Sequence, residues 1–121
     1  MAIVKSEIID NSLQSHNIRY CRDRHTDHLG KQHIGRFNCP KDTDPNTLLK
    51  DRAATIWLGL QQREIEEVVK RIAAGERVGK LGYTDWVAVK TRYTEVAIEI
   101  AETISELENE KTNLDSELKT R

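Results

Sequence analysis

Hydrophobic residues are spaced differently in the two halves of the chain, and residue 40 lies near the change. Ala2–Ile9 is a short run rich in Ile and Val, which is typical of a β-strand. Asn11–Asn17 is polar and indicates a turn. Ile18–Phe37 has Asp27-His28-Leu29-Gly30 at its centre, where Asp and Gly suit a type I turn followed by a left-handed residue. The first 40 residues therefore predict a short strand followed by a β-hairpin.

The turn fixes which residues of the hairpin face each other. The predicted cross-strand pairs are Asp27 with Lys31, His25 with His33, Asp23 with Gly35, and Cys21 with Phe37. Neither face of this hairpin is strongly apolar, and an isolated two-stranded hairpin is marginal in water. We expect it to join another sheet, in this chain or in a neighbour, and we take Tyr20 and Ile34 as candidate interface residues.

After residue 40 the apolar residues follow helical spacing. Asp44 is the expected N-cap of a helix over about 45–74, because Pro45 suits its first position. A Gly-rich connector over 75–82 follows. Thr84 is the expected cap of a last helix over about 85–119, which lacks Gly and Pro. The domain prediction is a hairpin docking module over 1–40 and a helical region over 41–121.

The last helix carries a repeat of seven residues. One set of heptad positions is Trp86, Tyr93, Ile100, Leu107 and Leu114, and the interleaved set is Lys90, Ala97, Ile104, Lys111 and Leu118. A repeat of seven sustained over five positions favours left-handed coiling around another helix. The neighbour is either the helix over about 45–74 of the same chain or a helix of another chain. The candidate interface residues here are Trp86, Tyr93, Ile100, Ile104, Leu107, Leu114 and Leu118.

These elements predict an α+β protein, and its composition narrows the function. The chain has 121 residues, of which 37% are hydrophobic, and its net charge is −1. Residues 81–121 carry five basic and nine acidic groups, which makes them poor phosphate binders. No apolar stretch approaches the length of a membrane span. The first residues lack a basic region followed by an apolar run, so we expect no signal peptide. We expect no membrane partner and little affinity for nucleic acid.

Residues 16–33 contain all four His and suggest a metal site. His25, His33 and Asp23 share one predicted face and have zinc-binding donor atoms. The spacings of known zinc motifs are absent, so a polar hairpin face is the preferred interpretation, with no metal and no cofactor. Cys21 and Cys39 are expected to be free thiols, although their diagonal placement leaves a disulfide conceivable.

Catalytic patterns are missing from the sequence. It has no Ser/His/Asp grouping in a strand–turn–helix context and no Gly-rich phosphate loop, so we expect no enzymatic activity. Arg22, Arg24 and Arg36 share one predicted hairpin face with Tyr20, an arrangement that could contact nucleic acid. The alternative functions are therefore a small dimeric nucleic-acid-associated regulator, and a His-rich metal-binding module.

Four segments of the first half of the chain stand out together. They are Arg19-Tyr20, Arg24-His25-Thr26-Asp27-His28-Leu29-Gly30-Lys31, Asp44-Pro45, and Leu48-Leu49-Lys50-Asp51-Arg52-Ala53. Through these segments, residues 1–65 resemble small structural proteins of tailed bacteriophages. The resemblance implies a virion component of the tail, baseplate or neck that is made in the host cytoplasm and contacts other virion proteins. If the protein is not part of a virus particle, we expect it in the cytoplasm. The expected function is a structural protein that bridges subunits of an assembly, including copies of itself.

Overall fold

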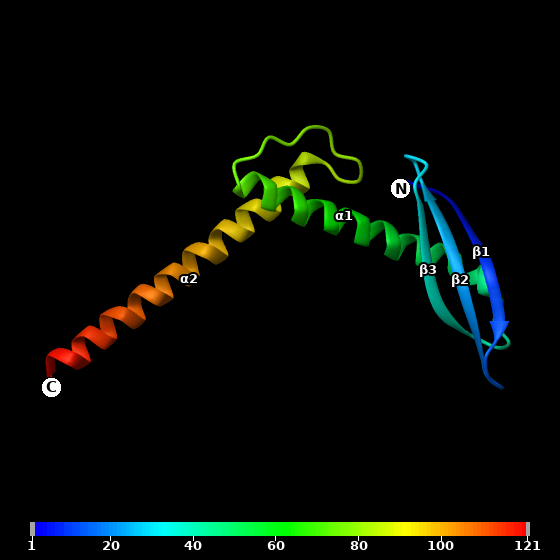
Figure 1. Cartoon of the computed structure of the whole chain (residues 1–121), viewed down its shortest axis with the longest axis horizontal. Helices are drawn as coiled ribbons and strands as arrows, with labels where there is room; N and C mark the ends of the chain where they lie inside the picture. Colours follow the sequence, from blue (N-terminus) through cyan, green and yellow to red (C-terminus); the bar gives the residue numbers. More distant parts are fainter. Residues whose placement is uncertain (1, 121) are drawn as a thin grey trace. The chain divides into compact units, whose positions relative to one another are not determined.

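The computed structural model describes residues 2–120, with side chains described through residue 114. The chain forms two compact units, Met1–Glu64 and Ile65–Arg121. A three-stranded antiparallel sheet is followed by two long helices, which confirms the predicted α+β class (Figure 1). None of the helices within the described residues has the length and apolarity needed to cross a membrane.

The sheet has the order β1-β2-β3, so β2 lies in the middle (Figure 1). The strands are β1 (Ile3–Leu13), β2 (Ile18–Asp27) and β3 (Gln32–Pro40). The β2–β3 hairpin has the predicted register, with His25 opposite His33 and Asp23 opposite Gly35. Gly30 has a φ of 82°, a conformation that is accessible to Gly because it lacks Cβ. The expectation that the hairpin joins a larger sheet is met within the chain, since β1 supplies the third strand.

β1 is longer than the sequence pattern indicates. Asn11, Ser12 and Leu13 belong to the strand, and the turn is confined to residues 14–17. Two register shifts interrupt its pairing with β2, one between Ile3 and Lys5 and one between Ile8 and Asp10. Each shift leaves one extra residue in β1, which is the definition of a β-bulge.

One face of β2 is buried although it is polar. Cys21, Asp23, His25 and Asp27 are each at most 1% exposed, while the residues between them are half-buried. The first turns of α1 (Leu49–Ala73) contact this face and the hairpin end through Arg52 and Trp57. Burial of such polar groups is tolerated only when each has a hydrogen-bond partner.

The helices begin at local capping interactions. Asp44 accepts a hydrogen bond at its Oδ1 from the backbone N–H of Asn46 over 3.0 Å, and a 3₁₀ turn η1 (Pro45–Leu48) leads into α1. α2 (Trp86–Thr120) is capped by Asp85, whose Oδ1 accepts from Ala88 N over 2.8 Å. The prediction of Thr84 as the cap was wrong by one residue. The Asp85 carboxylate therefore satisfies one of the free amides of the first turn.

The core of the second unit forms where the end of α1 meets the start of α2. Val68 and Val69 of α1 and Val89 of α2 are buried, and five partly buried side chains surround them: Ile65, Ile72, Val78, Leu81 and Val96. Val78 and Leu81 come from the connector, so this segment closes over the junction. The core is small and involves only the first turns of α2.

Candidate functional site

Exposed apolar side chains follow one another along α2, and we call them the α2 stripe. Its described members are Trp86, Tyr93, Ile100, Ile104, Leu107 and Leu114, and they are between 39% and 60% exposed. Leu118 also belongs to the predicted interface, but its side chain lies outside the described residues. Single exposed apolar residues are ordinary on protein surfaces, whereas a continuous stripe indicates an interaction site.

The part of α2 that packs within the chain is a different face. Val89 and Val96 lie one heptad apart and contact the end of α1, while Tyr93 between them remains 42% exposed. Arg92 strengthens the same junction, because its Nε donates to Glu66 Oε1 over 2.6 Å. Packing within the chain therefore occupies the Val89–Val96 face and leaves the α2 stripe open.

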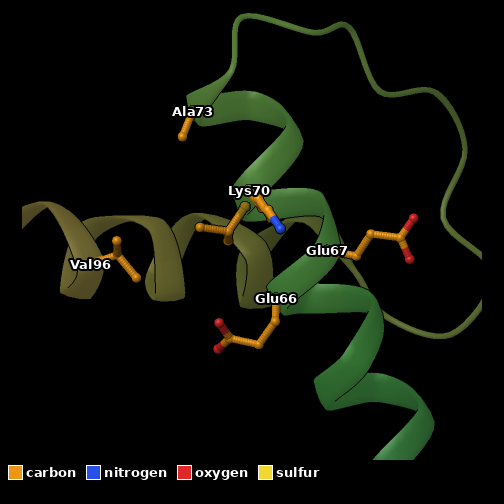
Figure 2. Close-up of a pocket in the computed structure, with 6 residues that line it drawn as sticks. Glu66, Glu67, Lys70, Ala73 and Val96 are labelled. Atoms are coloured by element: carbon orange, nitrogen blue, oxygen red, sulfur yellow. The ribbon is translucent and has the colours of Figure 1, made fainter.

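Two grooves border this helix junction. One, of about 360 Å³, is lined by Ile72 of α1 and by Trp86, Lys90 and Tyr93 of α2. The other, of about 530 Å³, is lined by Val69, Lys70 and Ala73 of α1 and by Val96 of α2, with Glu66 and Glu67 (Figure 2). In Figure 2 the carboxylate of Glu67 points away from Val96, whereas that of Glu66 pairs with Arg92 of α2. The first groove extends the α2 stripe onto α1, because it includes two stripe residues.

Among the described side chains of α2 beyond Val96, which end at Leu114, none is buried within the chain. Each residue from Ala97 to Leu114 is exposed. Acidic residues are frequent within this stretch, and Glu108 and Glu110 lie close to Lys111 in the sequence. An isolated helix with an exposed apolar stripe gains little from its own packing, and most helical stability in proteins comes from burial of such a face.

The two interface candidates of the sheet differ in exposure. Tyr20 on β2 is half-buried. Ile34 on β3 is 53% exposed, which makes it the more accessible of the two. Both remain predictions as interface residues.

The three metal candidates lie close together but form two separate pairs. His25 Nε2 lies 2.7 Å from Asp23 Oδ2, and His33 Nε2 lies 2.9 Å from Asp27 Oδ2. No group of three or more His, Cys, Asp or Glu residues among the described residues has the geometry to hold a metal ion. The predicted cross-strand pairing of His25 with His33 is confirmed, but each imidazole is directed at a carboxylate.

A line of polar side chains crosses the sheet beneath α1. Ser6 of β1 lies 2.7 Å from His25 Nδ1, and the opposite ring nitrogen, Nε2, meets Asp23. Asp23 also forms an ion pair with Arg52 of α1, whose Nη2 donates to Asp23 Oδ1 over 3.0 Å. We call Ser6, His25, Asp23 and Arg52 the buried polar line. Sequence reasoning missed it because Arg52 is distant in the chain and the β1 bulges hide the position of Ser6.

The electrostatics of the line are those of a stabilised carboxylate. Burial raises the pKa of Asp23, but hydrogen bonds from Arg52 and then His25 outweigh it, so the pKa lies below its usual value. With Asp23 ionised, Nε2 of His25 donates a hydrogen bond to it, and in the tautomer that carries its hydrogen on Nε2 the Nδ1 atom accepts a hydrogen bond from the Ser6 hydroxyl. Every buried side-chain nitrogen and oxygen in the described part of the chain has a partner.

The order Ser6–His25–Asp23 has the connectivity of a hydrolytic triad, but its surroundings differ. His25 is 0% exposed, so its ring has no surface on which to exchange a proton with a bound substrate. The Asp23 carboxylate is already bound by a guanidinium, which lowers its ability to stabilise an imidazolium. The geometry therefore suits an anchor between the sheet and α1.

The two cysteines are unbridged, and two hairpin arginines pair with carboxylates of β1. Cys21 and Cys39 are free and buried, as expected. Arg24 donates to Glu7 over 2.8 Å, and Arg22 pairs with Asp10, so β1 carboxylates neutralise two of the three arginines proposed for nucleic acid.

Comparisons with known protein families, characterised proteins and solved structures find no match to this chain.

Proposed function

We propose that this protein is a non-enzymatic assembly component that binds a helix of another subunit through the α2 stripe. The observation that carries the proposal is the exposure of this stripe along most of α2, beyond the part that packs on α1. Partners include further copies of the chain and other subunits of the same complex.

The size of the stripe supports a helical partner. From Trp86 to Leu114 it spans 28 steps along the helix, or about 42 Å at about 1.5 Å per residue. Each large apolar side chain contributes about 1.5–3 kcal/mol when it becomes fully buried. Several such residues at heptad spacing fit a helix that coils around α2 better than a flat surface.

The division into two units supports a bridging role. The sheet unit has its own hydrogen-bonded line, and the helical unit has its own apolar core. The partner surface on α2 lies in the second unit, so the first unit remains available for a different contact. Placement in a tailed-phage particle rests on the sequence resemblance and stays a prediction.

Multi-angle light scattering on the full chain, combined with circular dichroism, tests the role of the stripe. The test variant is Ile100→Asp with Leu107→Asp. The matched control is Ile98→Asp with Ser105→Asp, which adds the same charge to positions of α2 outside the stripe. We expect concentration-dependent self-association that the test variant abolishes and the control retains.

The helical circular dichroism signal provides a second readout of the same test. A partner-dependent α2 should lose helical signal in the test variant, because its C-terminal half has no other neighbour among the described residues. A monomeric wild type with full helicity, unchanged by Ile100→Asp with Leu107→Asp, would contradict the proposal.

A further inference from the structure

A groove of about 440 Å³ in the first unit lies between β3 and α1. Its lining includes Ile34 and Arg36 of β3, and Arg52, Ile56, Leu60 and Arg63 of α1. The groove is separate from the α2 stripe, which belongs to the second unit. It combines a strand edge with a helix face, and both can contribute to binding.

β3 is an edge strand whose outer side has no strand beside it in the described part of the chain (Figure 1). Asp27 N donates to Lys31 O over 3.0 Å, so alternation of the ladder turns the backbone groups of Gln32, Ile34 and Arg36 away from β2. These three residues border the groove. Backbone groups exposed on such an edge can pair with an added strand.

The two edges of the sheet differ in regularity. β1 contains two bulges, a device that distorts an edge and discourages pairing with another chain. β3 pairs with β2 from Ile18–Pro40 to Thr26–Gln32 without a register shift. The regular edge is therefore the one that borders the groove.

All the Arg, Lys, Asp and Glu residues that line the groove are positively charged. Three arginines line it, and none of its lining residues is Asp or Glu. Arg52 is neutralised by Asp23, whereas Arg36 and Arg63 form no ion pair with any side chain that the structure describes. The two uncompensated charges belong to different faces of this edge. Arg63 lines the groove with Ile56 and Leu60, whereas the side chain of Arg36, opposite Arg22 in the ladder, is on the other face of the sheet. A positive charge on each face favours an anionic partner.

We propose that an extended acidic peptide segment of another protein binds this groove as a fourth strand on β3. Its backbone pairs with the free edge at Ile34 and Arg36. Because its side chains alternate between the two faces, carboxylates on one face meet Arg36 and a carboxylate on the other face meets Arg63. Its apolar side chains contact Ile56 and Leu60. Main-chain pairing supplies affinity in this recognition mode, while side-chain contacts select the sequence.

Fluorescence anisotropy with the full chain tests the charge requirement. The probe is a fluorescein-labelled peptide of sequence Glu-Val-Glu-Glu-Glu-Val-Glu, which presents Glu on both faces of a strand and Val on one of them. Its twin has Lys in place of every Glu. We expect saturable binding of the acidic peptide only. Absence of saturable binding, or equal binding of the Lys twin, overturns the proposal.

Two charge-reversal variants locate the binding. Arg36→Glu with Arg63→Glu should raise the Kd at least about tenfold, because it replaces the attractive charges by repulsive ones. The matched control is Lys41→Glu with Lys50→Glu, which makes the same charge change at exposed positions of the same unit that do not line the groove. Equal weakening by both variants would mean non-specific attraction and would overturn the groove assignment.

Backbone pairing is tested on the peptide, so the fold of the protein stays unchanged. Only alternate amides of an added strand face β3. N-methylation of one alternate set should abolish binding, and N-methylation of the other set should leave it within about threefold. Equal affinity of both methylated peptides, or displacement of the probe by pyrophosphate at the same concentration, indicates a simple anion site and refutes strand addition.

Discussion

Replacing Arg52 by Met is the sharpest test of how the sheet and α1 are held together. Met keeps an unbranched apolar side chain but removes the guanidinium that binds Asp23. It also removes the stacking of that guanidinium over the Phe37 ring, where the Arg52 Cζ lies 4.2 Å from the ring centroid. Asp23 is left with His25 as its remaining side-chain partner among the hydrogen bonds described above.

The expected cost follows from burial. Removing one partner of a buried ion pair costs about 3–5 kcal/mol. Loss of a cation–π contact adds about 0.5–2 kcal/mol. Asp23 is fully buried but the Arg52 side chain is 26% exposed, so the lower end applies. We expect the free energy of unfolding of the first unit to fall by about 3 kcal/mol.

Urea unfolding in a Trp86→Phe background measures this value. Trp57 then remains as the sole tryptophan, and it reports on the first unit because it contacts His28 with ring centroids 6.0 Å apart. The double variant Asp23→Leu with Arg52→Met should recover most of the loss, since an apolar replacement of a buried pair is often neutral. A loss below about 1 kcal/mol for Arg52→Met, or no recovery in the double variant, would refute the anchoring role.

Three further predictions concern the same sheet. Gly35→Ala should destabilise the first unit by about 1–3 kcal/mol in urea unfolding, because an added Cβ would lie 2.6 Å from both Arg52 Nη2 and Asp23 Oδ1; a neutral effect would mean that the ion pair can shift freely. Cys21 and Cys39 should react slowly with a thiol reagent in the native state and rapidly in urea, because both are buried. The pKa of Cys21 is also raised, mainly by burial and secondly by the nearby Cys39. Fast labelling of the native protein contradicts this prediction. The folded pKa of Asp23 is lowered, so its contribution to stability is complete above its unfolded pKa of about 3.9 and is lost as the pH falls through the folded value; below about pH 4, stability should therefore fall less steeply in Asp23→Asn than in wild type, and identical slopes would exclude Asp23 as a source.

The hairpin was predictable because its signals are local. Asp27 and Gly30 fix the turn chemistry, and the turn in turn fixes every pair up to Cys21 and Phe37. The helix spans followed from Pro, Gly and apolar spacing in the same way. Such features depend on residues within a few positions of each other.

The buried polar line was not predictable for the opposite reason. Asp23 and Arg52 are 29 residues apart, and nothing near either residue indicates the other. Polar alternation in β2 looks like a solvated face until a long-range partner satisfies it. The same side chains that suggested a metal site are instead satisfied by Arg52, Ser6 and one another.

The α2 stripe is a third case, in which the coiled-coil interpretation of the pattern stays a prediction. Heptad spacing predicted a helical partner without choosing between chains. The contact within the chain uses Val89 and Val96, which lie outside the heptad sets. Two apolar faces overlap on the first turns of α2, and a single seven-residue repeat describes only one of them.

The two bulges of β1 also bear on how the length of this chain can vary. A deletion of one residue in β2 would turn Cys21, Asp23 or His25 from the buried face to the outside, since a shift of one residue inverts every later side chain. Val4 and Ile9 are the extra residues of the two bulges, so deleting either one would restore a continuous ladder locally. The edge strand β1 is therefore the strand of the sheet that best accommodates insertion or deletion of a single residue. Differences in length among related chains are expected in β1 first.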